Sequence, residues 1–211
     1  MATVLYVTAH PGNPEASFSL SVGNEFVEAY RKANPGDEIV HVDLFNQNIP
    51  QIDAEVLGAW GKLQGGTSFD QLSAGEQAKV ARLGEIVDQF VASDKVVFVN
   101  PMWNFSYPPV LKAYIDAICV GGKTFKYTEN GPVGLMTDKK ALHIQASGGV
   151  YSEGFMKDFE SGHRHLEKVM KFLGLPSFEG IFVEGMAAAP DQAPAIKEKA
   201  IQQARELAAS F

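Results

Sequence analysis

The sequence predicts one doubly wound α/β domain, in which a parallel sheet lies between two layers of helices. Strand-length apolar runs without polar alternation recur along the chain, which is typical of parallel strands covered on both faces. Helical patterns separate these runs, so strands and helices alternate. With 211 residues, 45% of them hydrophobic and 20% charged, the chain is long enough for a large core. We therefore expect a single domain over residues 1–211.

The clearest unit is a strand, a loop and a helix at residues 95–120. Residues 95–100 form a continuous β-branched and aromatic run, which predicts a strand near the middle of the sheet. Residues 101–109 read as an aromatic-rich loop that ends in two prolines. Proline has no N–H to lose in the first turn of a helix, so these residues fit the start of a helix at residues 110–120. The loop should be held rigidly.

The other elements follow from their own periodicity and caps. The expected strands are residues 3–8, 38–44, 95–100, 139–146 and 178–183. The expected helices are residues 17–33, 74–92, 110–120, 156–173 and 193–209, with a possible short helix at residues 53–62. Ser73 and Glu76 form a capping box at the start of the helix at residues 74–92. Residues 45–72 are predicted to pass over the sheet edge. Residues 121–132 suggest an irregular hairpin. This alternation favours a flavodoxin type of sheet with strand order 2-1-3-4-5 and helices on both faces.

Composition excludes several classes of protein. The net charge of -7, without a Lys/Arg run, argues against nucleic acid or an anionic membrane as the main partner. A single cysteine excludes an intramolecular disulfide, and Cys119 lies in an apolar helix face, where a core role is expected. No signal peptide or membrane-length segment is evident, so a cytoplasmic protein is expected. His163 and His165 are two apart on a helix and point to different faces, so we assign no metal.

The first loop after a strand is a candidate phosphate site. Ser17 and Ser19 offer hydroxyls, and the start of the helix offers free N–H groups and the positive end of its dipole. The loop has no Gly-Lys-Ser/Thr, Gly-x-Gly-x-x-Gly or Cys-Arg motif, which excludes triphosphatase, dinucleotide and phosphatase loops. A neutral loop for a phosphate monoester remains, as in flavin mononucleotide (FMN) proteins. The alternative is that either serine simply caps the helix.

Two further loops are expected at the same edge of the sheet. At residues 102–105, Asn104 is set among apolar rings, so its amide needs a partner such as a heterocycle edge; the alternative is an aromatic plug of the core. Residues 146–149 are small and allow close approach of backbone N–H groups to a ligand; the alternative is a plain Gly-Gly turn. The convergence of three loops on one crevice is stronger evidence than any one of them.

Four segments carry a resemblance to a known family. They are residues 101–105 (Pro-Met-Trp-Asn-Phe), residues 124–135 (Thr-Phe-Lys-Tyr-Thr-Glu-Asn-Gly-Pro-Val-Gly-Leu), residues 147–149 (Ser-Gly-Gly) and residues 182–185 (Phe-Val-Glu-Gly). Together they resemble the bacterial FMN-dependent NADH azoreductases, also called FMN-dependent NADH:quinone oxidoreductases. The similarity covers nearly the whole chain, and the segment at residues 124–135 is the most specific.

The resemblance implies a flavodoxin-like homodimer with noncovalent FMN, one per subunit, and active sites at the subunit interface. It implies ping-pong transfer of two electrons from NADH to quinones or azo compounds, with flavin N5 carrying the hydride and no catalytic side chain. The implied flavin contacts are His10, Ser17, Phe18, Ser19, Met102, Trp103, Asn104, Phe105, Ala146, Ser147, Gly148 and Gly149. The expected substrate pocket comprises Phe105, Phe125, Tyr127 and Tyr151. Two departures are notable, because His10 stands where several members have Ser, and Ala146-Ser147 replaces a Ser-Arg pair seen in some enterobacterial relatives.

Three alternatives remain open at this stage. An FAD-dependent quinone reductase of related fold would differ in its flavin. A flavodoxin-type electron carrier would bind FMN without oxidising NADH, although the segment at residues 45–72 and the aromatic hairpin exceed what a carrier needs. A binding module without flavin is the third alternative.

Overall fold

A five-stranded parallel sheet forms the centre of the computed structural model, which describes residues 1–211. Its strands are β1 (Thr3–Thr8), β2 (Glu38–Asp43), β3 (Lys95–Pro101), β6 (Lys140–Ser147) and β7 (Ser177–Glu184). The order across the sheet is β2-β1-β3-β6-β7, and every neighbouring pair is parallel. This is the predicted 2-1-3-4-5 order of a doubly wound sheet, with β3 in the middle and β2 at an edge.

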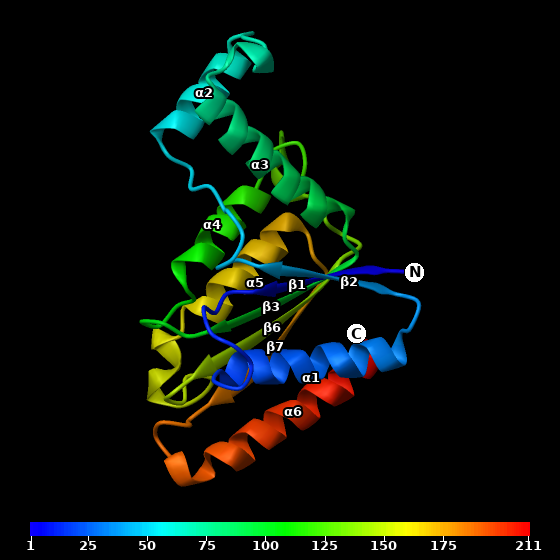
Figure 1. Cartoon of the computed structure of the whole chain (residues 1–211), viewed down its shortest axis with the longest axis vertical. Helices are drawn as coiled ribbons and strands as arrows, with labels where there is room; N and C mark the ends of the chain where they lie inside the picture. Colours follow the sequence, from blue (N-terminus) through cyan, green and yellow to red (C-terminus); the bar gives the residue numbers. More distant parts are fainter.

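Helices cover both faces of this sheet. They are α1 (Phe18–Ala33), α2 (Ala54–Gln64), α3 (Ala74–Ala92), α4 (Pro109–Ile118), α5 (Gly162–Leu173) and α6 (Ala193–Ser210). Helices α1 and α6 lie side by side on one face, whereas α4, α5 and the second half of α3 cover the other (Figure 1). Helix α2 packs on α3, and both extend beyond the sheet at the top of that view. The predicted short helix is therefore present and slightly longer than expected.

Each face of the sheet buries its own core. Successive side chains of a strand point to opposite faces, so Val97 joins the cluster that contains Phe26 and Tyr30, while Phe98 joins the cluster that contains Tyr114. All five side chains are essentially inaccessible to solvent. The central strand therefore connects both helix layers, and its carboxyl end is fixed firmly.

The prediction of one continuous helix over residues 156–173 is wrong. The chain forms a short 3₁₀ turn at Phe155–Phe159 and begins α5 only at Gly162. The Glu160 carboxylate accepts hydrogen bonds from the N–H groups of His163 (2.7 Å) and Arg164 (3.2 Å). These are first-turn donors without a partner in the helix, so Glu160 terminates the preceding turn and caps the helix.

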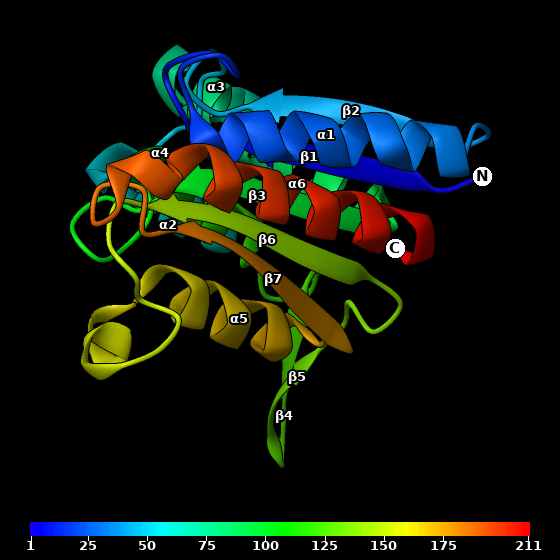
Figure 2. The same ribbon diagram turned by 90° about the horizontal axis from the view of Figure 1, so that it is seen from below.

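The predicted hairpin is confirmed as β4 (Phe125–Thr128) paired with β5 (Gly131–Gly134). It projects from the body beside α5 (Figure 2). The ring of Phe125 packs against Phe172 near the end of α5, with centroids 4.8 Å apart. Separately, none of the helices combines the length and apolar character that a membrane-spanning segment needs.

Stability should fall in mild acid because of His143 in β6. This side chain is fully buried, and burial, together with the neighbouring His163, lowers its pKa well below 6.5. Below about pH 6.5 the His143 imidazole is protonated in the unfolded chain but stays neutral in the folded chain. The free energy of unfolding therefore decreases as pH falls, by about 1.4 kcal/mol per pH unit. Urea unfolding of the wild type and of His143→Gln at about pH 7.5 and about pH 5.5 measures this. The variant should lose less stability than the wild type, and equal losses would contradict the assignment.

Candidate functional site

The three predicted loops meet at the carboxyl edge of the sheet, on the left in Figure 1. They follow β1, β3 and β6, which are neighbours in the sheet. The Ala9 N–H donates to the Val99 carbonyl (2.9 Å), and the Met102 N–H donates to the Ala146 carbonyl (2.7 Å). Backbone hydrogen bonds thus join the first loop to β3 and the second loop to β6.

The first loop ends in two buried serines at the start of α1. The Ser17 and Ser19 hydroxyls lie 3.2 Å apart, and Ser17 Oγ also accepts a hydrogen bond from the Leu20 N–H (3.3 Å). The N–H groups of Phe18 and Ser19 make no hydrogen bond within the chain. Ser17 is therefore a helix cap, as the alternative interpretation held. The two free N–H groups still provide donors at the positive end of the helix dipole.

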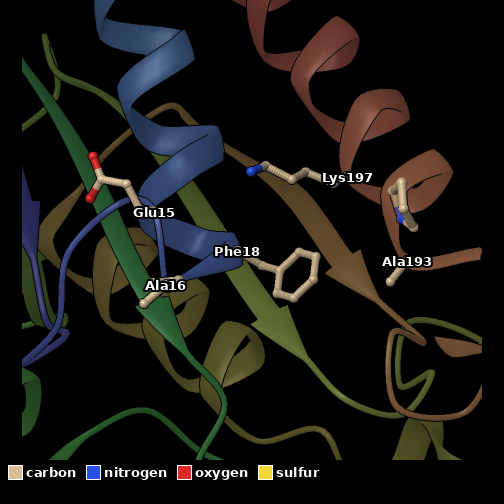
Figure 3. A pocket seen from close by; sticks show the side chains of 7 residues that line it. Glu15, Ala16, Phe18, Ala193 and Lys197 are labelled. Atoms are coloured by element: carbon tan, nitrogen blue, oxygen red, sulfur yellow. The ribbon is translucent and has the colours of Figure 1, made fainter.

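A hollow of about 330 Å³ lies beside these serines. It is lined by Glu15, Ala16, Ser17, Phe18, Ala193, Pro194 and Lys197. Phe18 points from α1 into the space between the starts of α1 and α6, and Lys197 faces it from α6 (Figure 3). The hollow includes no residue of the other two loops, so it extends the first loop toward α6.

The second loop is a tight turn with unusual backbone angles. Trp103 and Ser106 exchange two backbone hydrogen bonds of 2.7 and 3.0 Å, and between them Asn104 and Phe105 have φ values of 47° and 69°. Positive φ at both central residues is the geometry of a type I′ turn, which costs free energy in residues other than glycine. Asn104 is exposed at its tip between two exposed aromatic residues, and the role of its amide toward a heterocycle edge stays a prediction. The N–H groups of Asn104 and Phe105 are free of intramolecular partners.

The third loop has two adjacent backbone N–H groups without a hydrogen-bond partner. The carbonyls of Gly148 and Gly149 accept from the N–H groups of Ala187 (2.9 Å) and Gly185 (3.2 Å), whereas their own N–H groups have no partner in the chain. A Cβ at Gly149 would lie 3.1 Å from the Tyr151 ring. A larger residue there would therefore press on the Tyr151 ring, which would have to shift by a few tenths of an ångström.

Comparison with known proteins identifies the family. The model of the flavodoxin-like fold family matches residues 2–208. An FMN-dependent NADH:quinone oxidoreductase of Halalkalibacterium halodurans is 62% identical over 211 residues, which is 100% of both chains. This chain belongs to the family of FMN-dependent NADH:quinone oxidoreductases. The resemblance noted in the sequence is thus confirmed.

Two solved structures extend the comparison of this oxidoreductase family. An azoreductase from Bacillus anthracis has a TM-score of 0.93 and 36% identity, with 100% of both chains covered. An FMN-dependent NADH-azoreductase from the same species, solved in complex with FMN, has a TM-score of 0.92 and 33% identity over 99% of this chain and 98% of that one. The doubly wound architecture described above is therefore shared over the full length.

Only part of the predicted substrate pocket of this oxidoreductase comes together within one chain. The rings of Phe105 and Tyr151 lie 6.0 Å apart, and Phe159, which the sequence reasoning missed, lies 5.5 Å from Phe105. Phe125 and Tyr127 pack on each other instead, in the hairpin beside the other end of α5. They contact neither Phe105 nor Tyr151, so the four predicted residues do not form one cluster in a single subunit.

His10 lies two residues after the end of β1, at the start of the first loop. Its Nδ1 accepts a hydrogen bond from the Gly12 N–H (2.9 Å), and partial burial lowers its pKa. The imidazole is therefore neutral near pH 7, with Nε2 as its remaining N–H donor. It thus offers one hydrogen-bond donor at the start of the first loop.

Glu184 is a residue of the site that the sequence reasoning named without assigning a role. Its carboxylate accepts hydrogen bonds from the N–H groups of Tyr151 (2.8 Å) and Ser152 (3.0 Å) and from the Ser152 hydroxyl. It thus fixes the segment after Gly149 from the end of β7. The only sequence signal for a role of Glu184 was its place in the segment at residues 182–185, which resembles the family.

Replacing Glu184 by Gln should destabilise the protein by about 2 kcal/mol, because hydrogen bonds to a charged acceptor are among the stronger ones. The free energy of unfolding from urea titration measures the loss. Glu179→Gln is the matched control, since Glu179 lies on the same strand, is exposed and has no hydrogen-bond partner. Equal stabilities of the two variants would mean that Glu184 does not hold the loop.

Proposed function

We propose that the protein binds FMN noncovalently, one per chain, and passes two electrons from NADH to quinones and aromatic azo compounds. The name of the 62% identical relative and the FMN-bound azoreductase structure support this assignment. The observation that carries it is the set of free N–H donors on three loops at one sheet edge. An FAD-dependent reductase or a pure electron carrier is not favoured, because the full-length relative at 62% identity is an NADH oxidoreductase by name.

The first loop fits the phosphate of FMN. The hydroxyls of Ser17 and Ser19 and the free N–H groups of Phe18 and Ser19 are donors at a helix start, where an anion is stabilised. Lys197 adds a positive charge on the facing helix. A phosphate monoester would thus find donors of three kinds without displacing any backbone hydrogen bond.

The other two loops fit the flavin ring. The free N–H groups of Gly148 and Gly149 suit pyrimidine carbonyls and the negative charge that collects there on reduction, and those of Asn104 and Phe105 suit the ring edge. Bound FMN supplies the acceptance and release of hydride, for which no side chain of this protein has the chemistry. The protein's residues accordingly orient the ring and supply hydrogen bonds.

The aromatic residues shape the substrate side of the crevice. Tyr151 and Phe159 each pack on Phe105, and Phe105 and Phe159 remain about half exposed. Such a surface excludes water and accepts flat rings by stacking. A broad aromatic wall without charged partners suits a range of quinones and azo compounds.

We also propose a homodimer in the cytoplasm, in line with the family resemblance. Tyr127 is 78% exposed on its hairpin and Phe155 is 86% exposed, which is uncommon for aromatic residues of a monomer. A second copy would cover these rings and bring its hairpin, with Phe125 and Tyr127, to the crevice. Analytical ultracentrifugation tests this, and a monomer at micromolar concentration would contradict it.

Initial rates with NADH and 1,4-benzoquinone test the proposed activity. Double-reciprocal plots at several quinone concentrations should give parallel lines, because the two substrates use one site in turn. Intersecting lines would contradict alternate use of one site, and the absence of NADH oxidation by FMN-loaded protein would favour an electron carrier.

A further inference from the structure

A chain of buried polar side chains lies beneath the turn at residues 103–106. Asn100 on β3 and His143 and Gln145 on β6 point to the face that α5 covers, and each is at most 2% exposed. They meet His163 and Glu160 at the start of α5. Burying so many polar groups is costly unless they are hydrogen-bonded, and in this cluster one buried atom, Gln145 Oε1, has no partner. The proposed function gives this cluster no role.

The hydrogen-bond directions in this cluster follow from one carbonyl. The Pro101 carbonyl can only accept, so the Asn100 side-chain NH₂, 3.0 Å away, is its donor. The Asn100 oxygen then faces His143 Nε2 at 2.9 Å. That oxygen also can only accept, so His143 must carry its proton on Nε2.

The tautomer of the second histidine follows in turn. Burial lowers the pKa of both His143 and His163, so both rings are neutral and His143 Nδ1 is a bare acceptor. His163 Nδ1 lies 3.0 Å from it and must therefore donate. The two imidazoles thus hold opposite tautomers, His143 as Nε2–H and His163 as Nδ1–H, with the rings nearly parallel at 9°.

A second branch of this hydrogen-bond network starts at Gln145, which lies beside Asn100 on the neighbouring strand. Gln145, the register partner of Asn100, donates from its amide to the Glu160 carboxylate (3.1 Å), which also caps α5. Glu160 thereby fixes the adjacent Ser161, whose N–H donates to the Phe105 carbonyl (2.9 Å). One branch ends on the carbonyl of Pro101, just before the turn, and the other ends on the carbonyl of Phe105, within it.

The turn requires such support. Asn104 and Phe105 have positive φ, a backbone state that persists only where the surroundings enforce it. We propose that His143, His163 and Glu160 are positioning residues, which hold the turn at residues 103–106 in the shape that presents its free N–H groups to the flavin ring. The part that concerns the flavin depends on the proposed function.

The tautomers can be measured without any flavin. Two-dimensional NMR that correlates the ring nitrogens of ¹⁵N-labelled apoprotein with their carbon-bound protons distinguishes the two neutral forms. Near pH 7 one buried histidine should be the Nε2–H form and its partner the Nδ1–H form, and both should be assigned by the loss of their signals in His143→Gln and His163→Gln. Two Nε2–H rings, or a charged ring at that pH, would overturn the network.

Variants of His143 test the effect on the flavin. His143→Leu leaves the Asn100 oxygen without a donor, and should weaken FMN and riboflavin binding equally, by about tenfold. It should also shift the midpoint potential of bound FMN. His143→Gln can donate from the position of Nε2 and should restore both affinities to within about threefold of wild type. Unchanged affinity and potential in His143→Leu, or no recovery in His143→Gln, would overturn the positioning role.

Ser93→Ala is the control for a loss of stability alone. Ser93 is also buried, and its hydroxyl donates to the Phe90 carbonyl (2.8 Å). It lies just before β3, at the amino-terminal ends of the strands and away from the three loops. This variant should be less stable than the wild type and yet keep the wild-type flavin affinity and midpoint potential. If Ser93→Ala changed affinity and potential as much as His143→Leu does, the His143 effect would be non-specific and the proposal would be overturned. If the wild type binds no flavin, the proposed function fails, whereas the NMR result still decides the network.

Discussion

Replacing Ser17 and Ser19 together by alanine is expected to weaken FMN binding about a hundredfold, and riboflavin binding by no more than about threefold. A hydrogen bond to a charged group contributes about 1.5 kcal/mol or more, so two of them give about 3 kcal/mol. Riboflavin carries no phosphate and cannot use these hydroxyls. Quenching of flavin fluorescence in titrations with apoprotein measures both dissociation constants.

The control for this double variant is Ser73→Ala. Ser73 caps α3 as Ser17 caps α1, with its hydroxyl accepting from the Glu76 N–H (3.2 Å), and it lies outside the three loops. Loss of a cap costs about 1 kcal/mol of stability, so both proteins should unfold more easily. Only the double variant should lose FMN affinity. Equal losses for FMN and riboflavin would place the phosphate elsewhere.

Replacing Gly149 by valine should weaken FMN and riboflavin alike, by at least about tenfold. The new Cβ would lie 3.1 Å from the Tyr151 ring, and its methyl groups would crowd the ring further, so we expect the ring and the loop to shift apart. Its N–H groups then leave the positions proposed for the pyrimidine carbonyls. The same fluorescence titration reports the change.

Gly36→Val serves as the matched control, because nothing lies within 4 Å of a Cβ at Gly36. That residue lies in the turn before β2, at the other edge of the sheet. It should bind both flavins as the wild type does. A Gly149→Val protein that also binds them normally would show that the third loop does not contact the ring.

The sheet could be predicted because its strands are strongly apolar and alternate with amphipathic helices. The order of the strands follows from the connection rules of doubly wound sheets. The start of α5 was missed because Glu160 caps the helix from a position where helical periodicity continues into the preceding turn. An acidic side chain in that position looks like an ordinary residue of a longer helix.

The positions of the three loops could be predicted because parallel strands place their carboxyl ends at one edge. The geometry within them could not. Asparagine tolerates positive φ, so Asn104 gave a weak signal of the turn, but nothing in the sequence marks positive φ at Phe105. The contact between His143 and His163 depends on the register of β6 against α5, which only the folded chain fixes. The sequence likewise did not indicate that Phe125 packs beside the far end of α5.

The most direct test of the central claim is the visible absorption spectrum of the protein reconstituted with FMN and then given NADH without air. The account predicts a yellow protein that loses its colour promptly with NADH and regains it when a quinone is added. A yellow protein that NADH does not bleach would contradict the oxidoreductase function, and a protein that retains no FMN would contradict the assignment of all three loops.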